Sequence, residues 1–180
     1  MRILREDTAA IVVDIQERLM PALAEGEAFL KNAVLMVKGL QTLGIPILVT
    51  QQYTQGLGST VPEMVSCFED FLPIEKRDFS CCGADEVMFR LDEIHPRNVI
   101  LFGIESHVCL LQTALDLKEA GYQPVIVGDA VTSRSLVNKE LALERFRFEG
   151  IMVTSAESLL FELTRSSASP EFKAISKLVK

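Results

Sequence analysis

Short apolar runs rich in valine and isoleucine alternate along this chain with stretches whose apolar residues recur at helical spacing. Such runs are typical of buried β-strands, and a period of about 3.6 residues is typical of helices packed on one face. The pattern predicts strands at 8–13, 46–50, 71–75, 98–103, 124–128 and 151–154, the third interrupted by Pro73. It predicts helices at 29–43, 85–94, 107–120, 139–149 and 156–164, a terminal helix after a break at 166–170, and a polar loop at 51–62.

Strands that alternate with helices of this length form β-α-β crossovers, which make the strands parallel and cover both faces of the sheet. The predicted fold is therefore α/β: a three-layer α/β/α, Rossmann-like domain with a parallel six-stranded sheet. A length of 180 residues fits one domain, and no repeat or linker divides the chain. We expect a single domain over residues 1–180.

The net charge of −7 at pH 7 restricts the partners to expect. A nucleic-acid-binding protein needs a basic surface that neutralises phosphates, and an anionic membrane repels an acidic chain, so neither partner is expected. No apolar stretch approaches the length of a transmembrane helix, and the N-terminal apolar run is too short for a signal sequence. A cytoplasmic location follows as the expectation.

Cofactor signals are lacking in the sequence. Only two histidines are present, so a histidine-built metal site is not expected. The four cysteines show neither a disulfide framework nor a C-x-x-C pair. No G-x-G-x-x-G follows the first strand, where Asp14-Ile-Gln-Glu-Arg stands instead, so a dinucleotide is not expected. The sequence predicts no metal, no cofactor and a small-molecule substrate.

Polar residues at the ends of three predicted strands carry the candidate chemistry. Asp14 ends the first strand, Lys76 follows the third, and Cys109 lies in the first turn of the helix after the fourth. The carboxyl ends of parallel strands share one edge of the sheet, where ligands bind in such folds. A helix N-terminus and a nearby ammonium favour a thiolate, and a carboxylate can accept and return its proton. Together the three residues form a set suited to acyl transfer.

Each of these residues also has a simpler interpretation. Cys109 has apolar neighbours and could be a small buried hydrophobic residue, Asp14 a turn former, and Lys76 part of a solvated charge run. His107 is the rival partner for Cys109, but two residues on a helix are separated by about 200° of rotation, which points the side chains apart. Cys81 and Cys82 read most simply as incidental thiols in a turn. Only convergence of the three candidates at one site would favour catalysis.

At these residues the chain resembles the isochorismatase-like, or cysteine hydrolase, family, and is most similar to its branch of isochorismatase domain-containing proteins. The resemblance covers nearly the whole length, and the stretch GIESHVC is its most specific element. The similar segments are Ala10–Gln16 (AIVVDIQ), Gln52–Gly58 (QYTQGLG), Glu75–Ser80 (EKRDFS), Gly103–Ala114 (GIESHVCLLQTA), Gly128–Arg134 (GDAVTSR) and Phe172–Lys180 (FKAISKLVK).

The resemblance implies a role for each candidate. Cys109 would attack an amide carbonyl and form a thioester, Asp14 would move the proton, and Lys76 would balance the charge. A cis peptide would precede the cysteine, at Ile104–Glu105, and the backbone N–H groups of Glu105 and Cys109 would form an oxyanion hole. Family members of this kind are usually multimeric, which implies a homo-oligomer.

The segment after the second strand departs from one branch of the family. Nicotinamidase members bind a metal there through an aspartate and histidines, whereas this chain has Gln51-Gln-Tyr-Thr with no histidine. Position alone makes Gln16, Gln52, Tyr53 and Phe79 candidates for substrate binding.

The preferred hypothesis is a metal-independent cysteine hydrolase that cleaves the C–N bond of a small amide through a thioester on Cys109. One alternative is a non-catalytic, oligomeric binding or scaffold protein with the same fold. Another is a vinyl-ether hydrolase of the isochorismate type, although members with that activity work without the cysteine. A third is a redox or sulfur-handling protein that uses Cys81, Cys82 and Cys109.

Overall fold

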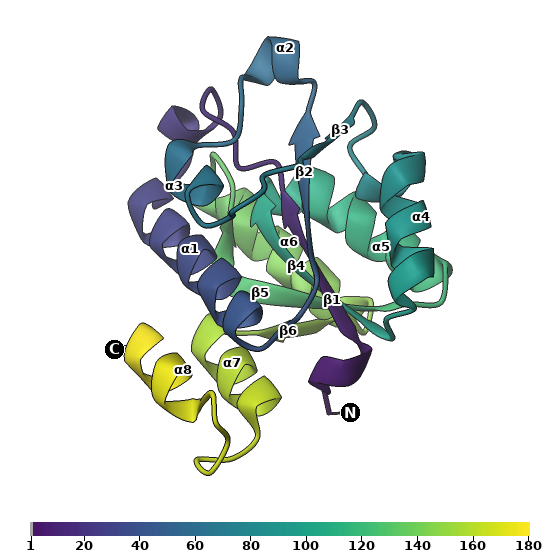
Figure 1. The fold of residues 1–180 in the computed structure, drawn as a ribbon. Helices are drawn as coiled ribbons and strands as arrows, with labels where there is room; N and C mark the ends of the chain where they lie inside the picture. Colours follow the sequence, from purple (N-terminus) through teal and green to yellow (C-terminus); the bar gives the residue numbers. More distant parts are fainter. Residues whose placement is uncertain (1) are drawn as a thin grey trace.

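A computed structural model describes residues 2–180, and its centre is a six-stranded, all-parallel sheet (Figure 1). The strand order is β3-β2-β1-β4-β5-β6. The strands are β1 (Thr8–Val13), β2 (Ile47–Gln52), β3 (Ile74–Lys76), β4 (Asn98–Ile104), β5 (Gln123–Thr132) and β6 (Met152–Thr154). The predicted fold class is confirmed.

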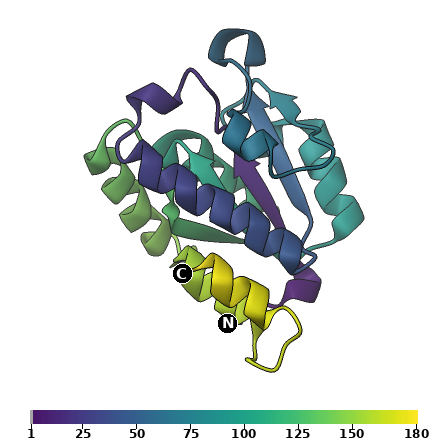
Figure 2. The ribbon, with the colours of Figure 1, turned by 60° about the vertical axis from the view of Figure 1, so that its left-hand side comes forward.

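Helices cover both faces of the sheet and complete the three layers (Figures 1 and 2). One layer contains α1, α7 and α8, which contact one another, and the other contains α4, α5 and α6. The helices are α1 (Gly26–Thr42), α2 (Thr54–Leu57), α3 (Pro62–Val65), α4 (Asp85–Ile94), α5 (Leu111–Glu119), α6 (Leu136–Phe148), α7 (Ala156–Thr164) and α8 (Phe172–Leu178).

The two central strands carry the core of the protein. Every residue of β1 and of β4 is buried, as expected for parallel strands with helices on both faces. The connections leave these neighbours in opposite directions, β1 toward β2 and β4 toward β5. In such a sheet a crevice opens between the carboxyl ends of the two strands where the order reverses. The end of β1 and the end of β4 therefore lie beside a natural binding position.

A glycine allows these two strands to come close at that end. Gly103 has φ of +130°, and a Cβ atom there would collide with the backbone of its register partner, Val13. Any other residue would push β4 away from β1. The segment that follows Gly103 is held next to the residue that follows Val13.

The predicted boundaries differ from the observed ones where tertiary pairing overrides local pattern. The predicted polar loop at 51–62 is wrong in part, because β2 continues to Gln52, α2 follows, and α3 starts at Pro62. Strand β2 continues through Gln51 and Gln52 because these residues pair with Glu75 and Lys76 of β3. The third strand is 74–76 and not 71–75, so Lys76 ends the strand and does not follow it.

The other boundaries shift by a few residues. Strand β5 runs to Thr132 and not to 128, because it pairs with β4 again after a register shift. Helix α6 starts at Leu136, three residues before the predicted 139. Among residues 2–180, no helix has both the length and the apolar character that crossing a membrane requires.

Candidate active site

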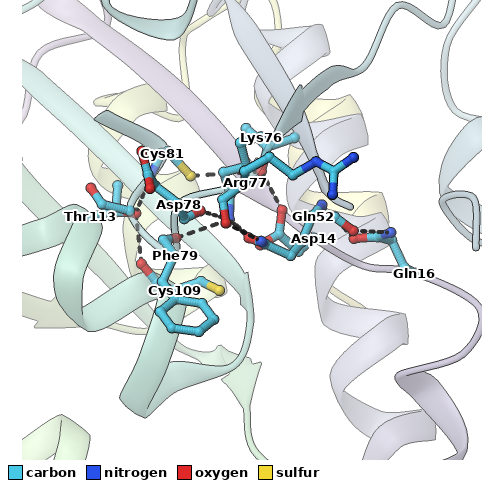
Figure 3. Close-up of polar contacts among 12 residues, drawn as sticks. Asp14, Gln16, Gln52, Lys76, Arg77, Asp78, Phe79, Cys81, Cys109 and Thr113 are labelled. Carbon is cyan, nitrogen blue, oxygen red and sulfur yellow. Dashed lines mark hydrogen bonds and ion pairs between the residues drawn. The ribbon is translucent and has the colours of Figure 1, made fainter. Parts of the chain in front are cut away.

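Asp14 and Lys76 form a buried ion pair at the carboxyl edge of the sheet (Figure 3). Asp14 directly follows β1 and Lys76 ends β3, so the pair reaches across the end of β2, which lies between these strands. The Lys76 Nζ lies 2.7 Å from the Asp14 Oδ2, and the two side chains are 0% and 1% exposed. At this depth each charge depends on the other, because neither is hydrated.

Three further oxygen atoms surround the Lys76 ammonium group. It donates hydrogen bonds to the Gln52 Oε1 at 2.6 Å, the Phe79 carbonyl at 2.9 Å and the Asp78 carbonyl at 3.2 Å. Burial lowers the pKa of Lys76, but attraction to the Asp14 carboxylate, and to Cys81 and Cys109 in their anionic forms, outweighs burial, and the net shift is upward. Lys76 is therefore a fixed positive charge at neutral pH.

The second oxygen of Asp14 is held from β2. The Thr50 hydroxyl donates to the Asp14 Oδ1 at 2.8 Å, and the same hydroxyl lies 3.7 Å from the Cys81 sulfur. Cys81 is completely buried. The carboxylate is thus fixed on both sides, and a second thiol shares its surroundings.

Cys109 lies in an unusual turn between β4 and α5. The Ile104–Glu105 peptide bond is cis, as the family resemblance implied. Ser106–Leu110 then forms one π-helical turn, in which the Leu110 N–H donates to the Glu105 carbonyl at 3.3 Å. The expected α-helical first turn at 107 is therefore wrong. Single π-turns of this kind are frequent at functional sites.

The Cys109 thiol is protonated at rest. Burial and the Asp14 carboxylate raise its pKa from 9.0 to about 12, although Lys76 acts in the opposite direction. The sequence argument expected the helix terminus and the lysine to favour a resting thiolate, and this expectation is wrong. Desolvation disfavours the charged form of a group that is only 8% exposed.

A cavity of about 110 Å³ joins the carboxylate to the thiol. Its walls are Asp14, Leu19, Gln52, Leu57, Phe79, Ile104, Glu105, Val108 and Cys109. Asp14 and Cys109 face one space, and Lys76 lies directly behind Asp14. The structure thus brings together the three residues that the sequence placed at the ends of three separate strands.

Contacts with the segment after β5 fix the turn that carries Cys109. The Glu105 carboxylate accepts hydrogen bonds from the backbone N–H and the Nε of Arg134, both at 3.0 Å. The His107 Nε2 lies 3.3 Å from the Asn138 Nδ2. His107 is therefore engaged with α6 and not with Cys109, in line with the rotation that separates them on a helix.

The four residues suggested for substrate binding divide into two pairs. Gln52 and Phe79 line the cavity, whereas Gln16 and Tyr53 do not. The Gln16 side chain is completely buried, accepts from the Gln52 N–H at 2.7 Å and donates to the Gln52 carbonyl at 3.0 Å. Tyr53 stacks against the guanidinium group of Arg77, whose carbon lies 4.1 Å from the ring centre. Gln16 thus holds the backbone of the wall residue Gln52, and Tyr53 packs on Arg77 outside the cavity.

Thr113 is a site residue that the sequence argument missed. Its hydroxyl donates to the Cys109 carbonyl at 2.7 Å and accepts from the Cys81 N–H at 2.8 Å, so it ties the cysteine turn to the loop after β3. A signal was available, since a threonine four residues after Cys109 on a helix can bond back to that carbonyl. The position of Cys81 beside Thr50 had no local signal, because the contact joins distant segments.

Two further observations concern cofactors and redox chemistry. Among residues 2–180, no cluster of three or more histidine, cysteine, aspartate or glutamate side chains is placed to hold a metal ion. All four cysteines, 67, 81, 82 and 109, are free thiols.

The buried thiols predict a loss of stability at alkaline pH. Burial raises the pKa of Cys81 and of Cys109 from 9.0 to about 12, and that of Cys82 to about 11. Between these values the unfolded chain loses protons that the folded chain keeps, so the stabilisation is complete below pH 9 and is lost as pH rises toward 12. We expect urea midpoints to fall between pH 8 and pH 10.5, and to fall less steeply in Cys81→Ala/Cys109→Ala. Parallel pH dependences in the two proteins would contradict this.

Comparisons with known proteins agree with the fold. The family model "Isochorismatase domain" matches residues 8–158. The mouse isochorismatase domain-containing protein 2A is 39% identical over 180 residues, covering 99% of this chain and 85% of its own.

Two solved structures extend the comparison. The MAR1 ribonuclease from Caenorhabditis elegans superimposes with a TM-score of 0.94 at 34% identity, covering 99% of this chain and 92% of its own. The Escherichia coli YcaC gene product, titled an octameric hydrolase of unknown specificity, gives a TM-score of 0.92 at 21% identity, covering 99% and 89%.

Proposed function

The chain belongs to the isochorismatase family, and from this premise we propose that it is a cysteine hydrolase that cleaves the C–N bond of a small amide. The observation that carries the proposal is the single cavity lined by a carboxylate and a thiol, with a buried ammonium behind the carboxylate. Acyl transfer needs a nucleophile and a proton carrier within reach of the same carbonyl.

In the first half-reaction the Cys109 sulfur attacks the amide carbonyl carbon. Because the resting thiol is protonated, its proton passes to Asp14 as the sulfur–carbon bond forms. Asp14 then gives this proton to the amide nitrogen, the carbon–nitrogen bond breaks, and ammonia or an amine leaves. The product on the enzyme is a thioester.

In the second half-reaction water replaces the amine. Asp14 takes a proton from water, the resulting oxygen nucleophile attacks the thioester carbon, and the sulfur–carbon bond breaks. The proton returns to the Cys109 sulfur, and a carboxylic acid leaves. No metal is needed for either half-reaction, because the nucleophile is a thiol and the base is a carboxylate.

Lys76 keeps the charge of the buried cluster constant through these steps. Moving a proton from Cys109 to Asp14 exchanges a carboxylate for a thiolate, and Lys76 attracts both anions. The total charge beside the ammonium does not change, so proton transfer creates no uncompensated charge in the interior.

Two backbone N–H groups are suited to stabilise the oxyanion of the tetrahedral intermediates. They belong to Glu105 and Cys109, which both line the cavity. No carbonyl within residues 2–180 accepts the Glu105 N–H, so it is free to donate to a substrate oxygen. Donors already in place contribute strongly to acyl transfer, because they need no reorganisation during the reaction.

Ribonuclease activity, named for the nematode structure, fits this chain less well. The net charge is −7, whereas a protein that holds RNA neutralises phosphates with basic side chains. The cavity, at about 110 Å³, is also too small for a nucleotide. A nucleotide is a drug-sized ligand, and sites for such ligands have volumes of roughly 300 Å³ or more.

The test is to incubate the purified protein with small primary amides and measure released ammonia and intact protein mass. We expect turnover that withstands EDTA, and a transient mass increase equal to the acyl group on the peptide containing Cys109. Cleavage of RNA or of a vinyl ether in the absence of amide turnover would contradict the proposal. A folded protein inert toward all of them would favour the scaffold alternative.

We also propose a homo-oligomer acting in the cytoplasm, with no nucleic-acid or membrane partner. The structurally similar YcaC protein of E. coli is described as an octamer. In this chain, α6 exposes three large apolar side chains, Val137, Leu141 and Phe148, which are 62%, 57% and 88% exposed. Large apolar side chains grouped on one helix are unfavourable in water and favour association. Light scattering of the purified protein measures its mass, and a monomer at micromolar concentration would contradict this.

A further inference from the structure

We infer that the substrate is an uncharged aliphatic amide with an acyl group of roughly two to four carbon atoms, a size taken from the cavity volume. The inference rests on the proposed function and adds the chemistry of the acyl group. It depends on the walls of the cavity beside Cys109, on the partners of its polar groups, and on its size.

Apolar side chains form most of the cavity wall. They come from the segment after β1, from α2, from the loop after β3, from the end of β4 and from the turn that carries Cys109: Leu19, Leu57, Phe79, Ile104 and Val108. These groups offer dispersion contacts and no hydrogen bonds. An acyl group made of methyl and methylene units matches such a wall.

The polar side chains at the cavity already have partners. Asp14 is paired with Lys76, and the Glu105 carboxylate is held by Arg134. The Gln52 amide is used at both ends, because its Oε1 accepts from Lys76 at 2.6 Å and its Nε2 donates to the Arg77 carbonyl at 2.6 Å.

A charged substituent on the substrate would therefore lose its hydration without gaining a partner. Burying an unpaired charge is strongly unfavourable, whereas a methyl group at the same position gains from burial. The cavity thus discriminates against carboxylate and ammonium substituents of equal size.

Volume sets the length of the acyl group. An apolar cavity of about 150 Å³ holds benzene, which has six carbon atoms. By proportion, the 110 Å³ beside Cys109 holds roughly four or five non-hydrogen atoms, the size of acetamide or propionamide with the carbonyl oxygen and the nitrogen included. Aromatic amides are too large to enter whole, and so are straight chains of six carbons or more.

Phe79 is the wall residue that limits this length. Its side chain is 53% exposed, so it separates the cavity from solvent, while its backbone carbonyl accepts from Lys76. Truncating the ring enlarges the cavity outward and leaves the carbonyl in place. Phe89 on α4 is exposed to a similar extent, 60%, and does not line the cavity, which makes it a matched control.

The experiment measures kcat/KM for acetamide, propionamide, butyramide, hexanamide and the carboxylate-bearing succinamate. We expect the maximum at acetamide or propionamide, hexanamide at least about tenfold lower than that maximum, and succinamate at least about 100-fold lower than butyramide. In Phe79→Ala the ratio of hexanamide to butyramide should rise about tenfold or more. Leu57→Ala should raise the same ratio, and Phe89→Ala should leave it unchanged.

The outcomes separate this inference from the function on which it rests. If amides are hydrolysed but succinamate or hexanamide is preferred, the inferred acyl chemistry is wrong and the hydrolase proposal stands. An unchanged length preference in both Phe79→Ala and Leu57→Ala would also overturn it. If no amide is turned over and Cys109 is never acylated, the proposed function fails, and the inferred substrate with it.

Discussion

Replacing Cys109 with alanine is expected to lower amide hydrolysis by about three orders of magnitude or more. The thiol is the nucleophile at the cavity that no charged partner holds, since Asp14 is engaged by Lys76 and Thr50, and the Glu105 carboxylate by Arg134. Without the sulfur, water would have to attack the amide directly. Steady-state ammonia release measures the loss, and intact mass spectrometry should show no acyl adduct on the variant.

Cys67→Ala is the matched control for this prediction. Cys67 is partly buried after α3, where its sulfur contacts the Glu63 carbonyl, and it does not line the cavity. Its removal should leave turnover within about twofold of the wild-type rate, since a substitution near the surface and away from the cavity has a small effect on the folded protein. Equal turnover by wild type and a folded Cys109→Ala would exclude the thioester mechanism.

Replacing Lys76 with methionine is expected to lower the free energy of unfolding by about 3–5 kcal/mol. Methionine matches the length of the side chain but removes the charge, and leaves the Asp14 carboxylate buried without its counter-ion. Two backbone carbonyls and the Gln52 amide also lose their donor. For a chain of this size the expected fall in Tm is roughly 6–20 °C, measured by calorimetry.

Lys31→Met on α1 is the control, because Lys31 is exposed and its removal should change Tm by less than about 2 °C. Asp14→Asn/Lys76→Met tests the cause, since removing both charges should restore part of the stability lost in Lys76→Met alone. A double variant as unstable as the sum of the single variants would show that the pair is not coupled. Hydrolysis should be strongly reduced in both variants, because Asp14, the proposed proton carrier, is altered or loses its counter-ion.

The sequence by itself determined the architecture and predicted the three residues that the candidate site brings together. Apolar runs such as Thr8–Val13 and Asn98–Gly103 specify buried parallel strands, and their order along the chain requires crossover helices. Because carboxyl ends of parallel strands share one edge, the positions of Asp14 and Cys109 after these strands, and of Lys76 at the end of a third, already predicted that the three residues lie near one another. Periodicity and strand direction are local properties of the chain, so sequence is sufficient for both.

Only the tertiary structure decided what these residues contact and how they are protonated. The Cys109 thiol is neutral at rest, since burial and the Asp14 charge act on it from outside its own helix. Gln16, which was expected to bind substrate, instead holds the backbone of Gln52, and the incidental-looking Cys81 lies within the charged cluster. Desolvation and charge–charge interactions sum over neighbours that are distant in sequence, so no local pattern encodes them.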